Sequence, residues 1–325
     1  MNNLECTYLG LNFRNPLIVS SSGLTSSLEK LKRLDEAGAG AVVLKSVFEE
    51  QIINETSSLE NYSDYTEASD YLSVYLKEEY INKYISLIAE AKKALPIPVI
   101  GSINCISVGE WIDYARRIEK AGADAIELNI FLLPADREQH SDQIEQHYLK
   151  IVKQVADTVA IPVSVKVGSR FTNLLGMVKG IEHRGAKGVV MFNRFYEPDI
   201  NIEAIVVTEA DIFSTPSELR NAIRWIGMAS AEFKNLDFAA STGVHSGESA
   251  VKALLAGAAV YEVCTAIYEH GMGAIREIND FVAGWMERKG FSSVAEFKGK
   301  LNYANVKNPI AFERSQFMKY YSSHE

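Results

Sequence analysis

Two lysines and three asparagines stand directly after short apolar runs in this 325-residue chain. Lys45 follows AVVL and Lys166 follows PVSV, while Asn104, Asn129 and Asn193 end three further runs of the same kind. A lysine that follows apolar residues is partly desolvated, so its charge acts more strongly on a bound group than it would in water. An asparagine offers both a donor and an acceptor, which suits an imide or a carboxylate. These residue types predict a site for a small polar molecule.

The apolar runs recur along the chain and alternate with segments of helical period. They predict strands, each followed by a helix, at residues 16–23, 41–46, 98–105, 125–130, 162–168, 188–193, 237–243 and 259–265. Eight such units over roughly 250 residues are typical of an α/β protein with a single (β/α)8 TIM barrel. A doubly wound open sheet is the alternative, but no G-x-G-x-x-G motif follows the first strand.

We expect one domain over residues 1–325, with its barrel core at about 16–290. A lid-like loop inserted after the second strand is predicted at 47–78, and a C-terminal tail at 300–325. The tail carries aromatic residues that suit either a subunit interface or packing on the outside of the barrel.

The carboxyl ends of the strands build the active site in a barrel of this kind. Each predicted strand ends on polar residues there or continues into them, and the set comprises Ser21, Ser22, Lys45, Ser46, Asn104, Asn129, Lys166, Asn193, Arg194, Ser241, Thr242, Gly243, Cys264 and Thr265. Strands that become polar where they meet solvent would explain a single serine or asparagine. They do not explain two lysines and three asparagines on one rim, so we predict a binding site.

The loops after the last two predicted strands, STGVHSGES and CTAIYEHG, suit a phosphate group. Gly243 lets the backbone approach closely, and Ser246 begins a helix whose free N–H groups attract an anion. Thr265 adds a hydroxyl. The six histidines are scattered and show no ligand spacing, so no metal site is predicted.

Composition excludes several classes of partner. The net charge of −9 and the lack of a basic patch argue against nucleic acid. No apolar run approaches the ~20 residues that span a bilayer, and the N-terminus does not read as a signal peptide. Three cysteines, an odd number, fit a reducing compartment. We therefore expect a cytoplasmic protein that acts on a small molecule.

Taken in order, the motifs resemble those of the dihydroorotate dehydrogenases, in particular the class 1 enzymes that bind FMN. The segments NPLIVSSSG, GAGAVVLKS, ELN and SVKV resemble the family's first, second, fourth and fifth strands, and STGVHSGESA resembles its phosphate loop. The resemblance covers approximately residues 7–301. It implies a barrel that binds FMN and forms a homodimer.

The same resemblance implies roles for the rim residues. Those that would surround the flavin ring are Ser21, Ser22, Lys45, Ser46, Asn104, Asn129, Lys166 and Asn193. Those that would hold the phosphate are Thr242, Gly243, Cys264 and Thr265, and Ser241 is a further predicted cofactor-binding residue. We assign Lys166 to the N1/O2 edge of the ring, where a cation stabilises the charge that a hydride brings. Lys45 is the predicted catalytic residue. Substrate binding is assigned to Lys45, Asn129, Asn193 and Arg194.

The chain departs from the family where the proton is removed from the substrate. The family's fourth strand continues N-x-S-C-P-N with a cysteine base, but residues 129–134 read NIFLLP. Candidate substitutes are Cys105, His140 or a Tyr or Glu of the lid-like loop. That loop is acidic, with Lys77 its one basic residue, and should repel an anion. The family's glycine pair ahead of the sixth helix is replaced by EADIFSTPSEL.

Three functions remain open on the sequence. The first is an FMN-dependent oxidoreductase that transfers a hydride between flavin and a small cyclic, pyrimidine-like substrate other than dihydroorotate. The second is a dihydroorotate dehydrogenase whose base has moved. The third abandons redox chemistry, as a Schiff-base lyase of the aldolase type on Lys166 or Lys45, or as a barrel that binds FMN without turnover.

Overall fold

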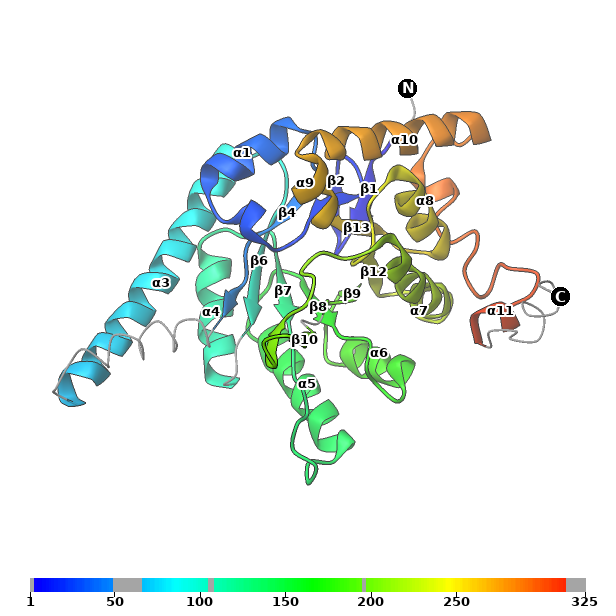
Figure 1. The fold of residues 1–325 in the computed structure, drawn as a ribbon. Coiled ribbons are helices and arrows are strands. Elements are labelled where there is room, and N and C mark those ends of the chain that lie inside the picture. The colour runs from blue at the N-terminus through cyan, green and yellow to red at the C-terminus, as the bar shows by residue number, and fades with distance from the viewer. Residues whose placement is uncertain (1–2, 49–65, 105–107, 195–196, 314–325) are drawn as a thin grey trace.

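A closed barrel of parallel strands forms the centre of the protein in the computed structural model, which describes residues 3–48, 66–104, 108–194 and 197–313 (Figure 1). Its strands are β3 (Leu17–Val19), β4 (Ala41–Val43), β6 (Val99–Asn104), β7 (Ala125–Asn129), β8 (Val163–Val167), β9 (Gly188–Met191), β12 (Asp237–Ala240) and β13 (Val260–Val263). The sheet runs in the order β4-β3-β13-β12-β9-β8-β7-β6, and pairing of β4 with β6 closes the ring. The predicted (β/α)8 TIM barrel is confirmed.

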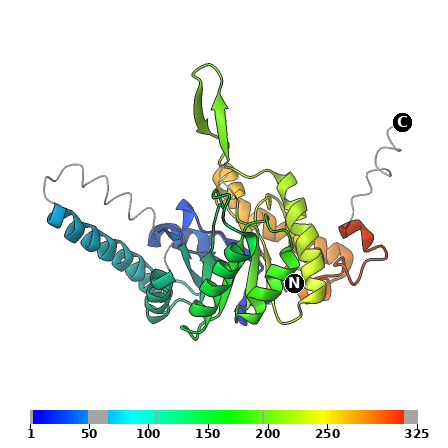
Figure 2. The ribbon, with the colours of Figure 1, turned by 90° about the horizontal axis from the view of Figure 1, so that it is seen from below.

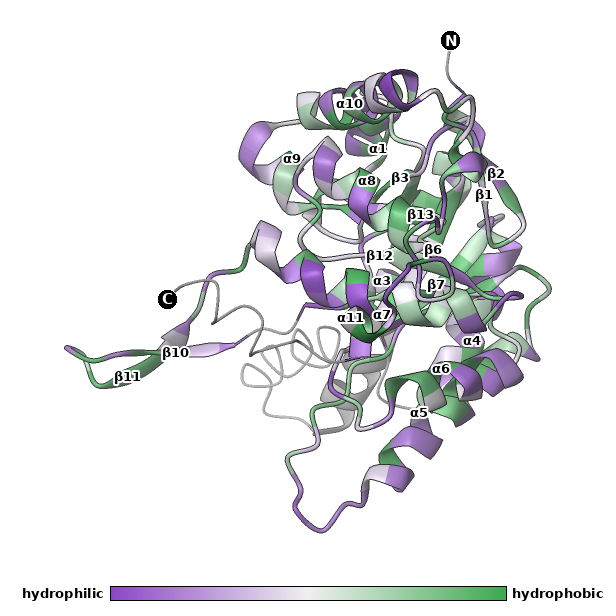
Figure 3. Cartoon of the chain, turned by 90° about the vertical axis from the view of Figure 1, so that its right-hand side faces the viewer, coloured by the Kyte–Doolittle hydropathy of each residue, from purple (hydrophilic) through white to green (hydrophobic). Residues whose placement is uncertain are grey.

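Helices cover the outside of this barrel (Figure 1). They are α1 (Leu28–Glu36), α3 (Thr66–Ala94), α4 (Val108–Lys120), α5 (Ser141–Ala156), α6 (Leu174–His183), α7 (Leu219–Glu232), α8 (Gly247–Ala256), α9 (Thr265–His270) and α10 (Gly273–Lys289). The short helix α11 (Ile310–Glu313) lies farther out, beyond α7, and the 3-10 turns are η1 (Gly23–Thr25), η2 (Pro216–Glu218) and η3 (Val294–Glu296). Hydrophobic residues line the barrel strands and hydrophilic ones face outward on the helices (Figure 3). Among the described residues, no helix combines the length and apolar character needed to cross a membrane.

A short hairpin closes the amino-terminal end of the barrel. Its strands, β1 (Cys6–Tyr8) and β2 (Leu11–Phe13), are antiparallel. Tyr8 and Phe13 are buried in a cluster with Ile18, Val43 and Val260 from the barrel strands. A Cβ atom on Gly188 would lie 2.6 Å from Leu9 Cδ2, so the hairpin packs tightly against the first residue of β9. The hairpin forms the floor of the barrel, and the open end is the one where the strands finish.

The segment predicted as a lid-like loop, 47–78, differs in part from that expectation. Residues 47–48 form strand β5 (Val47–Phe48), which pairs with β6, and residues 66–78 belong to helix α3. Helix α3 spans 29 residues without a proline or glycine, so nothing in the sequence stops it before it reaches the barrel. The remainder of the predicted loop, residues 49–65, lies outside the described residues.

Two further segments lie outside the barrel proper. Strands β10 (Pro198–Asn201) and β11 (Val206–Glu209) form an antiparallel hairpin that projects away from the barrel (Figure 2). The described part of the predicted tail packs on α7, because Tyr303 N donates to the Gly227 carbonyl at 2.8 Å and Phe312 lies against Gly227. Residues 314–325 of the tail lie outside the described residues.

The close approach of β3 and β4 at Gly40 gives a test of the fold. A Cβ atom there would lie 2.1 Å from the Asn15 carbonyl oxygen and 2.9 Å from that of Leu17, so Gly40→Ala requires the backbone to move. We expect the free energy of unfolding to fall by about 1–3 kcal/mol, measured by urea denaturation. Gly109→Ala is the control, because its Cβ would point into open space on α4, and it should lose no stability. Equal stability of the two variants would contradict this packing.

Candidate functional site

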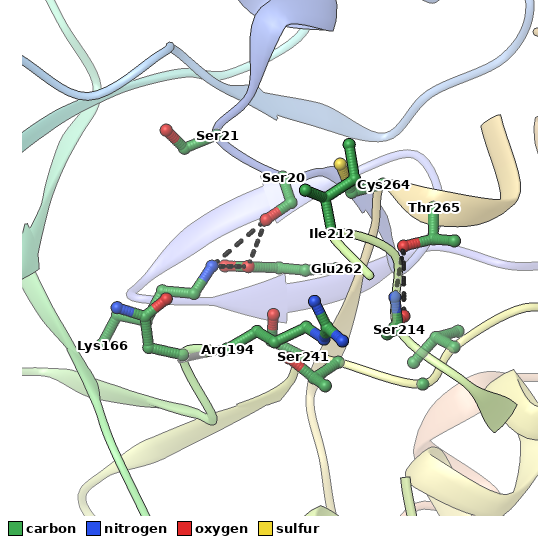
Figure 4. A pocket seen from close by; sticks show the side chains of 14 residues that line it. Ser20, Ser21, Lys166, Arg194, Ile212, Ser214, Ser241, Glu262, Cys264 and Thr265 are labelled. Carbon is green, nitrogen blue, oxygen red and sulfur yellow. Dashed lines mark hydrogen bonds and ion pairs between the residues drawn. The ribbon is translucent and has the colours of Figure 1, made fainter. Parts of the chain in front are cut away.

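A cavity opens at the carboxyl ends of the strands (Figure 4). The predicted site residues in its wall are Ser21, Lys166, Asn193, Arg194, Ser241, Thr242, Gly243, Cys264 and Thr265. The structure thus brings together residues from the ends of β3, β8, β9, β12 and β13. The wall also contains residues that the sequence analysis missed, namely Ser20, Ile212, Ser214, Val244 and Glu262.

The other predicted serines support the wall from behind. Ser46 N donates to Ser21 Oγ at 2.8 Å, and the Ser46 hydroxyl is also 2.7 Å from the hydroxyl of Ser102 on β6. Ser46 is buried, and its hydroxyl links Ser21, which follows β3, to Ser102 of β6. Ser22 caps turn η1, where its side chain accepts from Leu24 N. These two side chains therefore position Ser21 and its loop instead of facing the cavity.

Two of the three predicted asparagines are hydrogen-bonded to each other. Asn193 Nδ2 donates to Asn129 Oδ1 at 2.7 Å, and this hydrogen bond bridges the ends of β9 and β7. The strand between them, β8, carries Lys166, which pairs in register with Asn129. Asn104 is buried at the end of β6 and is not part of the cavity wall. The amide pair fixes the side of the cavity next to Lys166.

Lys166 makes close polar contacts with two buried residues of the cavity wall. Its Nζ lies 2.6 Å from Glu262 Oε2 on β13 and 3.1 Å from Ser20 Oγ (Figure 4). Ser20 Oγ in turn donates to the same Glu262 oxygen at 2.9 Å. All three residues are buried. The sequence analysis missed Glu262. Its signal is a glutamate inside the apolar run AVYEVCT, at a position that strand alternation turns toward the barrel interior.

A second carboxyl group lies under this pair. Glu127 on β7 has an oxygen 3.8 Å from Lys166 Nζ and is almost completely buried. Burial raises the pKa of Glu127 well above its ordinary value, and the neighbouring Glu262 raises it further. Burial and the neighbouring Glu262 thus favour the protonated form of Glu127 more strongly than in an exposed glutamate.

The charges of Lys166 and Glu262 stabilise each other. Burial alone would raise the pKa of Glu262, but Lys166 and the hydrogen bonds hold that pKa below its ordinary value. Burial would likewise lower the pKa of Lys166, but the carboxyl groups of Glu262 and Glu127 raise it above its ordinary value. The layer thus combines a close ion pair of Lys166 and Glu262 with a second carboxyl group, that of Glu127, 3.8 Å from Lys166 Nζ.

The predicted catalytic residue Lys45 lies apart from this layer. It is half-buried after β4 and is not part of the cavity wall. Its backbone N–H donates to the Thr25 carbonyl at 3.4 Å. The structure therefore gives Lys45 a place on the rim but does not bring it together with Lys166.

The side predicted to bind phosphate is held by a chain of side-chain contacts. Ser214 N and Ser214 Oγ both donate to Thr265 Oγ1, at 3.2 and 3.1 Å, and Ser214 Oγ lies 2.9 Å from His245 Nε2. Ser214 belongs to the segment EADIFSTPSEL, where the family's glycine pair is replaced. Ser214 and Thr265 both line the cavity, and their hydroxyls are hydrogen-bonded to each other there.

Part of the predicted anion grip is occupied by the chain itself. The N–H groups of His245 and Ser246 both donate to Ser249 Oγ, at 3.0 and 2.9 Å. Thr242 Oγ1 donates to the Phe192 carbonyl at 2.9 Å. Gly243 has a left-handed φ of 89°, and a Cβ there would lie 2.4 Å from Leu219 N, so only glycine fits this turn.

Arg194 adds a guanidinium to the cavity wall. Its Nη1 donates to the Asp211 carbonyl at 2.8 Å, and its Nε lies 3.4 Å from a Glu218 oxygen. The side chain is half-buried. It is thereby fixed beside the predicted phosphate and substrate positions, and its positive charge suits an anionic group.

The loop after β7 offers no proton acceptor at the place where the family has its cysteine. Leu132 N donates to Tyr148 Oη at 3.1 Å, and Leu132, Leu133 and Pro134 line a separate groove beside α5. His140, one of the candidate bases, is exposed at the start of α5 and is not in the cavity wall. Cys105 and the predicted lid residues 49–65 lie outside the described residues.

The closed barrel and the position of its cavity define the class of protein to which the chain belongs. A closed barrel with a polar cavity at the carboxyl ends of its strands belongs to the (β/α)8-barrel class in which that end carries the site. Among the described residues there is no group of three or more His, Cys, Asp or Glu side chains arranged to bind a metal ion.

The comparison with known families identifies the chain within that class. The profile described as "Dihydroorotate dehydrogenase" matches residues 3–286, and the chain belongs to this family. It is 26% identical over 313 residues to "Dihydroorotate dehydrogenase B (NAD(+)), catalytic subunit" of Thermoplasma volcanium, covering 92% of this chain and 98% of the relative. It is 28% identical over 308 residues to the protein of that name from Pyrococcus abyssi, covering 91% and 98%. At the family level the protein is a flavin-dependent oxidoreductase that acts on CH–CH groups.

The buried pair gives a test of the site's construction. Lys166→Met leaves the Glu262 carboxylate buried without its partner, so we expect a loss of about 3–5 kcal/mol in the free energy of unfolding, measured by urea denaturation at neutral pH. Lys252→Met is the control, because its ion pair with Glu248 is exposed on α8 and solvent screening should leave it almost no effect on stability. Similar losses in both variants would show that Glu262 does not depend on Lys166.

Proposed function

We propose that this protein is an FMN-dependent oxidoreductase that transfers a hydride between the flavin and a small cyclic, pyrimidine-like substrate other than dihydroorotate. The observation that carries the proposal is the cavity itself. It combines a buried ammonium, Lys166, with the amide of Asn193 and the hydroxyls of Thr265 and Ser214, while the neighbouring residues 131–134 supply no proton acceptor.

The donor set suits FMN. Ser21, Lys166 and Asn193 would hold the ring, and Thr242, Gly243 and Thr265 would hold the phosphate side. Bound FMN supplies the hydride chemistry. Lys166 would place its ammonium group, paired with Glu262, at the ring edge, and the Asn129–Asn193 hydrogen bond orients the neighbouring amide.

The substrate assignment rests on the missing proton acceptor in residues 131–134. General-base catalysis contributes typically 10²- to 10⁴-fold to a rate, and Leu132 cannot accept a proton at the position of the family's cysteine. Asn193 and Arg194 remain in the cavity wall as donors for a carbonyl or a carboxylate. We therefore assign these two residues to the substrate and retain Lys45 as a further candidate from the rim. A homodimer and a cytoplasmic location stay predictions.

A Schiff-base lyase fits the geometry less well. Such a lysine must be a neutral amine to attack a carbonyl group, whereas Lys166 is an ammonium held by Glu262 at 2.6 Å. The second candidate function is a barrel that binds FMN without turnover, and the missing proton acceptor is the observation that favours it.

Titration of FMN into the purified protein tests the proposal directly. We expect quenching of flavin fluorescence with one FMN bound per chain, followed by anaerobic reduction and then reoxidation by an unsaturated cyclic imide. Reoxidation by none of a panel of pyrimidine-like compounds would favour the barrel without turnover. Absence of FMN binding, with borohydride trapping of a carbonyl compound on Lys166, would overturn the proposal in favour of the lyase.

Restoring the proton acceptor tests the substrate assignment. Leu132→Cys places a thiol where the family has one, and we expect trace oxidation of dihydroorotate to rise by about 10²-fold or more. Leu133→Cys is the matched control, because this neighbour is 62% exposed and lies one residue beyond the matching position. The measurement is anaerobic reduction of bound FMN by dihydroorotate. If neither variant changes the rate, the missing proton acceptor does not explain why the protein fails to oxidise dihydroorotate.

A further inference from the structure

Three charged or acidic residues converge inside the barrel beneath the cavity. Lys166 and Glu262 both stand in the cavity wall and lie 2.6 Å apart, whereas Glu127 approaches Lys166 to 3.8 Å from below and is not in the wall. Ser20 bonds to both members of the pair. A buried ion pair is weak evidence for stability, because the cost of desolvating two charges offsets much of their attraction. The position of Glu262 in the wall therefore points to a role at the ligand.

The ion pair of Lys166 and Glu262 changes the electrostatic field that acts on a molecule bound at the cavity wall. A single buried ammonium there would act as a full positive charge on any group above it. A carboxylate 2.6 Å from that ammonium cancels most of its field, and two hydrogen-bonded neighbours fix the carboxylate in place. Glu127 lies farther from Lys166 Nζ, at 3.8 Å, and burial raises its pKa, so it offsets less of that charge. The ligand thus meets a dipole and not a cation.

For a flavin, this difference affects the two oxidation states unequally. A positive charge near the ring edge stabilises the reduced, electron-rich form more than the oxidised form. A cation that is already neutralised gives less of this preference. The ratio of the affinities for the two forms, and with it the reduction potential, depends on the charge of Glu262.

We propose that Glu262 is a positioning residue that lowers the reduction potential of bound FMN by holding Lys166 in a neutral pair. The inference rests on the proposed function, since it requires FMN in this cavity. It adds to that function a residue that acts on the cofactor through Lys166. Strand β13 thereby contributes to the redox property as well as to the barrel wall.

The test compares reduction potentials of the FMN-loaded protein and its Glu262→Gln variant. Glutamine keeps the shape and the hydrogen bonds but removes the negative charge, which leaves the ammonium unpaired. We expect the preference for reduced over oxidised FMN to rise about tenfold or more, which for a two-electron couple is an upward shift of about 30 mV. The potential is measured by anaerobic equilibration with a reference dye. A purely structural role for Glu262 would not move it in this direction.

Glu127→Gln is the matched control. It is the same substitution in the same buried layer, but the Glu127 oxygen lies 3.8 Å from Lys166 Nζ, against 2.6 Å for Glu262, and Glu127 is not in the cavity wall. We expect its potential to shift by much less than that of Glu262→Gln. A shift in Glu127→Gln as large as that in Glu262→Gln would overturn the proposal, because it would reflect a general disturbance of the layer.

A second variant covers the case in which Glu262→Gln fails to fold. Glu262→Asp keeps the charge but withdraws it by one methylene group from Lys166, and we expect a smaller upward shift. An unchanged or lower potential in the folded variants that bind FMN overturns this inference and leaves the proposed function standing. Failure of the unchanged protein to bind FMN overturns the proposed function and the inference with it.

Discussion

Hydrogen bonds between β4 and β6 close the ring of strands, and the arrangement of the site depends on that closure. Once the ring is closed, residues that are far apart in sequence reach the same rim, because parallel strands all end on the same side. Lys166 and Glu262 are 96 positions apart along the chain and still meet at 2.6 Å. An open sheet would place the strands that carry them too far apart for this contact.

The sequence predicts the barrel well because its signal is repeated. Each of the eight barrel strands falls within a predicted apolar run, and the polar residue that ends a run marks the rim. The floor hairpin escapes prediction because strands of three residues, such as Cys6–Tyr8, are too short to show a period. Helix α3 is mistaken for a loop over residues 66–78, because its acidic and serine-rich start resembles a solvated segment.

The site is predicted less completely than the fold, for a physical reason. Lys166 and Asn193 stand at the ends of runs, where a polar residue attracts attention, but Glu262 and Ser20 lie within or beside apolar runs. Their importance comes from partners on other strands, which one sequence cannot pair. Lys45 shows the converse, since its position at the end of a run predicts a site residue but its side chain is not in the cavity wall.

The floor hairpin also determines from which end of the barrel solvent can reach the buried layer of Lys166, Glu262 and Glu127. Tyr8 and Phe13 are 1% exposed and pack against the first residues of the barrel strands, so they block that end. Water and protons therefore reach the Lys166 layer from the rim. A flat ring lying across that rim would close the remaining entrance, and the molecule that occupies the cavity would itself isolate the charges beneath it from bulk solvent. The hairpin thus closes one end of the barrel permanently, whereas the bound molecule closes the other end only while it is present.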